Sequence, residues 1–286
     1  MHPAWFTEAV AQKPEHHNLE ILGKRIHCQT WGDDSLPGLL FVHGHAAHAH
    51  WWDFIAPQFQ QDYRVAAMDM SGNGDSQHRD QYSASQFAEE IAAVSKWLGT
   101  DTLVVAHSFG GSMARIAAHL YPESLRGLIL VDSVISSNRR EASTPQPVAP
   151  PRERIYASIE QAAKRFRLRP PQPRPKSYIQ EYIANHSVQQ VETGYRFKLD
   201  PQVFDKMWPE SEPLPDGVSM VENLKVPCGY IYGELSRFCP AEAIVMLKAL
   251  FPAENLIGIP EAYHHVFLDQ PEEFVVQLRL LLNRLS

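Results

Sequence analysis

Short apolar runs alternate with longer amphipathic stretches along most of the chain. The runs are continuous, and after a β-rich segment at residues 19–28 they cover 39–43, 64–68, 103–106, 127–131, 229–232 and 256–259. Stretches with helical spacing of apolar residues cover 84–98, 112–119, 241–250 and 271–285. Because strands buried on both faces have continuous apolar sequences, this alternation predicts an α/β fold: a mostly parallel central sheet with helices on both faces.

The alternation stops between residues 133 and 223. Helical patterns are still present there, at 152–166 and 176–191, but prolines cluster around them at 145, 147, 150, 151, 170, 171, 173 and 175. Proline-rich segments form stiff extended connectors. We therefore predict a first core part at residues 1–134, a helical lid insert at 135–222 and a second core part at 223–286, which suits a chain of 286 residues.

Composition excludes several classes of protein. A net charge of −7 argues against nucleic acid as a partner, and the basic stretch 164–176, interrupted by prolines, is expected to form a solvated surface. No apolar run is long enough for a membrane span, and the first residues lack a secretory signal pattern. With three cysteines and no C-x-x-C spacing, we expect a reduced, cytoplasmic protein. The sequence indicates no oligomeric state.

A serine stands where a predicted strand passes into a predicted helix. Ser108 follows the apolar run 103–106 and precedes Gly110, Gly111 and the helical pattern that starts at residue 112. Such a sharp corner exposes Oγ, and its strained backbone needs small neighbours. No Gly-Lys-Ser/Thr follows, which excludes a phosphate-binding P-loop, whereas an ordinary strand-to-helix loop remains the alternative.

A nucleophilic serine requires a base, and the base requires an orienting acid. His264 and His265 lie in the loop after the last predicted strand, immediately before the last predicted helix. Since the carboxyl ends of parallel strands share one edge of a sheet, a histidine in this loop is expected to reach the serine corner.

Three motifs in this order resemble those of the α/β-hydrolase family. They are His43-Gly44 after an apolar run, the stretch 106–111 around the serine, and His264 followed by the sequence at 268–274. Ala106 replaces the first glycine of the usual G-x-S-x-G pattern. The resemblance implies the serine-nucleophile, lid-bearing, esterase-like branch, with Ser108 as nucleophile and His264 as base. The serine argues against the aspartate-nucleophile branches of this fold, the haloalkane dehalogenases and epoxide hydrolases. For His265 we expect a structural role.

The acid is where the chain departs from the family pattern. Ser236 occupies the position, after the penultimate strand, where the resemblance leads us to expect aspartate. Some family members carry the acid one strand earlier, which here is Asp132. We favour Asp132 as the catalytic acid and keep Glu234 as the alternative, because both lie at strand ends where such groups converge.

An oxyanion hole is expected from two backbone N–H groups, those of Phe109 and His45. His43 is expected to shape the loop by hydrogen bonding. The histidines at 43, 45, 48 and 50 also resemble the H-x-H-x-D-H zinc signature of the metallo-β-lactamase fold, but Ala47 stands where that motif needs aspartate. That interpretation also leaves Ser108 unexplained, so we expect no metal and no cofactor.

The predicted function is hydrolysis of a carboxylic ester or related small acyl substrate through an acyl-enzyme intermediate. The same residues would serve a thioesterase, a lactonase, a carbon–carbon bond hydrolase or a perhydrolase, because a fold does not specify its substrate. A hydrolase-fold binding protein that has lost turnover stays open because of Ser236. A zinc metallohydrolase is the remaining alternative.

Overall fold

The centre of the molecule is one eight-stranded sheet. The computed structural model describes residues 2–137, 154–173 and 176–285. The strand order is β1-β2-β4-β3-β5-β6-β9-β10. The strands are β1 (Glu15–Ile21), β2 (Lys24–Trp31), β3 (Gly38–Val42), β4 (Arg64–Met68), β5 (Leu103–His107), β6 (Gly127–Val131), β9 (Cys228–Gly233) and β10 (Leu256–Ile259). Two of the strand pairs, β1–β2 and β2–β4, are antiparallel, and the other five pairs are parallel, which confirms the mostly parallel sheet.

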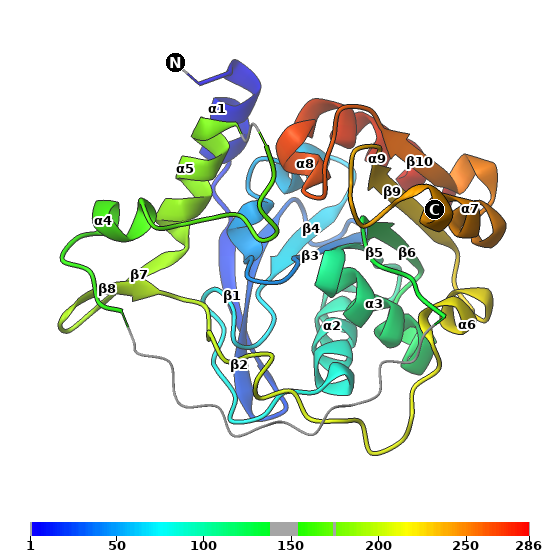
Figure 1. Ribbon diagram of the computed structural model, residues 1–286, viewed down its shortest axis with the longest axis horizontal. Helices are drawn as coiled ribbons and strands as arrows, with labels where there is room; N and C mark the ends of the chain where they lie inside the picture. Colours follow the sequence, from blue (N-terminus) through cyan, green and yellow to red (C-terminus); the bar gives the residue numbers. More distant parts are fainter. Residues whose placement is uncertain (1, 138–153, 174–175, 286) are drawn as a thin grey trace.

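Helices cover both faces of the sheet, as Figure 1 shows. One face carries α2 (Ala84–Leu98), α3 (Ser108–Leu120), α6 (Gly217–Glu222) and α7 (Ala241–Leu250). The other face carries α1 (Ala4–Ala11), the 3₁₀ turns η1 (Ala49–Trp51) and η2 (Ala56–Phe59), α8 (Val266–Asp269) and α9 (Pro271–Leu285). Short 3₁₀ turns η3 (Pro122–Ser124) and η4 (Ala253–Asn255) precede β6 and β10.

The strands divide their side chains between two apolar cores. On β3, Leu40 and Val42 pack into the core under α2 and α3, whereas Leu39 and Phe41 pack into the core under α9. Successive residues of a strand point to opposite faces, so a strand between two helical layers must be apolar at every position. This is the physical reason for the continuous apolar runs in the sequence.

The segment between β6 and β9 contains strands as well as helices. Its helices before α6 are α4 (Ile159–Ala163) and α5 (Ser177–His186), and its strands β7 (Val188–Val191) and β8 (Gly194–Phe197) form a hairpin. The predicted helical stretch 176–191 therefore ends at His186. Of the predicted stretch 152–166, the structure describes residues 154–166, and among these only α4 is helical. The prolines at 145, 147, 150, 151 and 175 lie outside the described residues.

The insert, which is the segment between β6 and β9, packs against one end of the sheet with its flanking helices (Figure 1). The ring of Tyr178 on α5 contacts that of Phe6 on α1, with 4.9 Å between centroids, and α5 also contacts η1. Within the described ranges, no helix combines the length and apolarity required to cross a bilayer.

Two features of the amino-terminal region differ from the sequence prediction. Helix α1 was not predicted, and residues 19–28 do not form one strand. They bend at Leu22 and Gly23, which have positive φ, into the β1–β2 hairpin.

Candidate active site

Ser108 lies at the corner between β5 and α3, in a left-handed backbone conformation with φ of 53°. A residue other than glycine adopts this conformation only where its surroundings enforce it. Gly110 and Gly111 lack a Cβ, so the segments around His43 and Ser133 can pack closely against this corner and hold the conformation. A Cβ on Gly110 would lie 2.2 Å from the His43 carbonyl oxygen, and one on Gly111 would lie 2.6 Å from Cβ of Ser133.

A continuous hydrogen-bonded chain runs from the serine to a buried carboxylate. Nε2 of His264, in the loop between β10 and α8, lies 2.9 Å from Oγ of Ser108. Nδ1 of the same ring lies 2.7 Å from Oδ1 of Asp132, which directly follows β6. His264 is 5% exposed and Asp132 is fully buried. The structure thus brings together three of the residues that the sequence singled out.

The carboxylate of Asp132 accepts hydrogen bonds from several elements. Besides the imidazole, the Gly233 N–H donates to Oδ2 at 3.0 Å and the Ser236 hydroxyl donates to Oδ1 at 2.6 Å. Ser236, at the position where the family resemblance led us to expect aspartate, therefore donates a hydrogen bond to the proposed acid. The alternative acid, Glu234, has an exposed side chain, and no hydrogen bond joins it to His264 in the part of the chain that the structure describes.

The predicted oxyanion donors lie on the two loops that flank the serine. Phe109 is the second residue of α3, and His45 lies in the loop between β3 and η1. Among the described residues, neither backbone N–H has a hydrogen-bond acceptor. Nδ1–H of His43 donates to the Gly44 carbonyl at 2.7 Å, and its Nε2 accepts the Met70 N–H at 3.1 Å. Burial lowers the pKa of His43, so a neutral ring shapes this loop.

Sequence reasoning missed His107, although it adjoins the proposed nucleophile, Ser108. Its Nε2–H donates to the carbonyl oxygen of His264 at 3.0 Å. Burial lowers the pKa of His107 well below its ordinary value, so the ring is neutral and suited to hold the backbone of the proposed base. The only signal in the sequence was its place between strand and serine.

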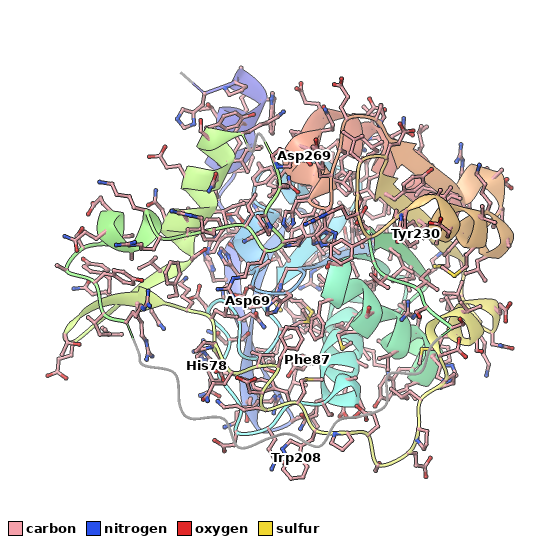
Figure 2. The ribbon with its side chains drawn as sticks, viewed as in Figure 1. Asp69, His78, Phe87, Trp208, Tyr230 and Asp269 are labelled. Carbon is pink, nitrogen blue, oxygen red and sulfur yellow. The ribbon has the colours of Figure 1, made fainter. Side chains whose placement is uncertain are left out.

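The neighbouring His265 joins the insert to the core. Its Nε2–H donates to the Pro170 carbonyl at 3.2 Å, and its backbone N–H donates to Gln172 Oε1 at 3.1 Å. The Gln172 amide in turn donates to Oδ1 of Asp269 at 2.6 Å, at the end of α8 (Figure 2). Burial lowers the pKa of His265 to about 3. A neutral ring with these partners fits the structural role that the sequence predicted.

In the described structure, the histidines at 43, 45, 48 and 50 do not form one group of metal-ligand atoms, although their spacing resembled a zinc signature. In the described residues, groups with ligand atoms close enough for one ion are His50/Asp53/His186, His27/Asp69/Asp75 and His107/His264/His265. His50 is the one member of the cluster found in these groups. His48 instead hydrogen-bonds Ser187 at 2.8 Å, and the ring of His45 lies tilted against that of Phe204, with 4.3 Å between centroids.

Two cavities are lined in part by residues 165–173. One of about 440 Å³ is lined by His264, Phe238, Tyr263 and residues 170–173. A larger cavity of about 910 Å³ is lined by residues that include Ala46, which directly follows the predicted oxyanion donor His45. The proposed base thus faces a space of the size that binds small molecules.

Comparisons with known proteins agree with this architecture. The model of the alpha/beta hydrolase family matches residues 39–278. The pimeloyl-[acyl-carrier protein] methyl ester esterase of Aeromonas salmonicida is 24% identical over 257 residues, 85% of this chain and 94% of that protein. Epoxide hydrolase 1 of Caenorhabditis elegans is 35% identical over 150 residues, 51% of this chain and 34% of that protein.

A solved structure resembles nearly the whole chain. The thioesterase domain from the curacin biosynthetic pathway superposes with a TM-score of 0.77 at 24% identity, covering 93% of this chain and 99% of that one. At this identity the likeness supports the fold, and the family match spans most of the sequence. The chain belongs to the alpha/beta hydrolase family.

Proposed function

We propose that the protein is a serine hydrolase that cleaves a carboxylic ester or a related acyl compound. The observation that carries this proposal is the hydrogen-bonded chain from Ser108 through His264 to Asp132, in a family of hydrolases. A hydroxyl, an imidazole and a buried carboxylate in this order form the arrangement that activates a serine for acyl transfer.

In the proposed mechanism, His264 takes the proton of the Ser108 hydroxyl as Oγ attacks the substrate carbonyl carbon. The charge of Asp132 stabilises the imidazolium that forms and keeps the proton of the neutral ring on Nδ1. The N–H groups of Phe109 and His45 bind the oxyanion of the tetrahedral intermediate. The protonated imidazole then protonates the leaving group, and an acyl-enzyme remains on Ser108.

Deacylation reverses these roles with water as nucleophile. His264 takes a proton from the water molecule, whose oxygen attacks the acyl carbon, and then returns a proton to Oγ of Ser108. The acid product leaves, and the hydroxyl is restored.

The comparisons support ester or thioester cleavage. The esterase relative aligns over almost its full length, and the thioesterase domain shares the fold. The partial match to an epoxide hydrolase carries less weight, because Ser108 occupies the position at which the aspartate-nucleophile branches of the fold carry aspartate. The binding-protein alternative loses its main argument, because Asp132 supplies the carboxylate that Ser236 cannot.

The test is covalent labelling together with turnover. A fluorophosphonate probe should modify wild-type protein at Ser108, because only an activated serine reacts readily with it. Ser108→Ala should lose both labelling and hydrolysis of short p-nitrophenyl esters. Wild-type activity in Ser108→Ala would refute the proposal, and an unlabelled wild-type protein without esterase activity would favour the binding protein.

A further inference from the structure

The larger cavity lies between the insert and the core, beside the proposed oxyanion loop. Its volume is about 910 Å³, and its wall includes Ala46, Ala47 and His48 from that loop. The other side is formed by residues 165–169, by β8 with the residues that follow it, and by Asp200. This volume is that of a small-molecule site.

Positive charge dominates the wall, although the chain as a whole is acidic at −7. The cationic side chains include Arg165, Arg167, Arg169, Arg196, Lys198 and Lys206. Asp200 is the one carboxylate among the lining residues that the structure describes. It is engaged by the Lys206 ammonium at 2.8 Å and by the Tyr82 hydroxyl at 2.9 Å.

Three of these arginines come from one segment, residues 165–169, in which exposed and buried side chains alternate. Phe166 and Leu168 are buried in the apolar core, whereas Arg165, Arg167 and Arg169 are exposed between them. Within residues 2–137, 154–173 and 176–285, none of the three arginines pairs with a carboxylate. The arginines of this stretch are exposed, as expected for a solvated surface, and they also line the cavity. Apolar packing at alternate positions directs them there.

The cationic wall adjoins the loop that carries the proposed oxyanion donor His45. Burial and then the charge of Arg169 lower the pKa of His45 to about 4, so this guanidinium lies within electrostatic range of the oxyanion loop. The next residue, Pro170, accepts the hydrogen bond from His265, which adjoins the proposed base. A ligand in the cavity would thus lie against the loop that holds the reacting carbonyl.

We infer that the substrate carries an anionic group, a carboxylate or a phosphate, which this cavity binds while the acyl carbon is at Ser108. The inference rests on the proposed function and names its substrate class. Arginine binds both anions through paired N–H donors. Lys198 and Lys206 already pair with Asp75 and Asp200, at 2.7 and 2.8 Å, whereas Arg165 and Arg169 pair with no carboxylate in the described residues and are available to an anion.

The experiment compares substrates that differ in one anionic group. Monomethyl adipate is set against methyl hexanoate, which tests a carboxylate on the acyl part. S-acetyl phosphopantetheine is set against S-acetyl pantetheine, which tests a phosphate on the leaving group. We expect kcat/KM to favour the anionic member of at least one pair by about tenfold or more at low salt, and this ratio to fall at high ionic strength.

Variants locate the effect in the cavity. Arg165→Gln and Arg169→Gln should each lower the anionic-to-neutral ratio by about tenfold, the usual loss for one charge-assisted hydrogen bond. Lys164→Gln is the matched control, because Lys164 is exposed, adjoins Arg165 and does not line the cavity. Its ratio should equal that of the wild type. If Arg165→Gln and Arg169→Gln keep the wild-type ratio, as the control does, the inference is wrong.

Direct binding separates failure of the inference from failure of the proposed function. Adipate and phosphopantetheine are titrated into Ser108→Ala protein by calorimetry, where no turnover is needed. Binding of either anion that is weakened by Arg165→Gln supports the anionic cavity even if no ester is cleaved. If neutral esters are hydrolysed but no anion binds or is preferred, the hydrolase proposal stands and the anionic substrate class is wrong.

Discussion

Replacing the buried carboxylate by an amide of the same size, Asp132→Asn, removes the negative charge from the proposed triad. The groups around the carboxylate are all donors: the His264 Nδ1–H and the Ser236 hydroxyl at Oδ1, and the Gly233 N–H at Oδ2. In either orientation, the new NH₂ group therefore faces a donor. The imidazole either loses its partner or takes the wrong tautomer, and its charged form loses stabilisation.

The expected loss in kcat is about 10⁴-fold, the effect of the same change in other serine triads. At about 1.36 kcal/mol for each factor of ten, this is about 5.5 kcal/mol of transition-state stabilisation. The assay is steady-state hydrolysis of p-nitrophenyl acetate, with the active sites of wild-type protein titrated by a fluorophosphonate. Circular dichroism and the thermal midpoint control for misfolding.

Two further variants make the result specific. Glu234→Gln should retain wild-type kcat, because the Glu234 side chain is exposed and makes no hydrogen bond to His264 in the described structure. Asp132→Asn/Ser236→Asp should recover part of the lost activity, because Oγ of Ser236 lies only 2.6 Å from Oδ1 of Asp132. If Asp132→Asn stays within about tenfold of wild type while Glu234→Gln is inactive, the assignment of the acid is refuted.

Three other changes test the surroundings of the site. Gly44→Ala should lower kcat, because its Cβ would lie 2.8 Å from His107 Nδ1 and displace the oxyanion loop; unchanged kinetics would contradict this. Burial lowers the pKa of His265 to about 3, so its contribution to stability is present above about pH 6.5 and lost as pH falls toward 3; His265→Gln should flatten that loss in urea titrations. Burial raises the pKa of Asp269 to about 6, so the folded state retains a proton that the unfolded chain releases near pH 4, and stability falls as pH rises through this window; Asp269→Asn should abolish that slope.

Much of the sheet domain was predictable because its local signals agree with its tertiary environment. The bounds of β4, β6 and β10 match the apolar runs, and α2, α7 and α9 match the helical patterns. β4 and β6 are buried between helices, and the edge strand β10 is partly buried, so burial and periodicity indicate the same element. The corner at Ser108 was predictable for a similar reason, since the backbone strain there requires glycines that are visible in the sequence.

The insert could not be predicted in this way because its structure depends on distant partners. Residues 188–191 have a helical pattern, yet they pair with β8, whose Phe197 lies opposite Val188. The arginines at 165, 167 and 169 line a cavity because the loop at 46–48 forms another part of its wall, and the sequence does not show that these distant segments meet. The choice between Asp132 and Glu234 also required long-range geometry, because both follow strands at the same sheet edge.

The account depends on an activated hydroxyl at the corner between β5 and α3. The most direct measurement is peptide-mapping mass spectrometry after brief exposure to a fluorophosphonate, carried out on wild-type protein and on His264→Gln. The account predicts one adduct on Ser108 in the wild type and almost none in the variant, because the imidazole at 2.9 Å activates the serine. An adduct on another residue, or equal labelling of Ser108 in both proteins, would contradict it.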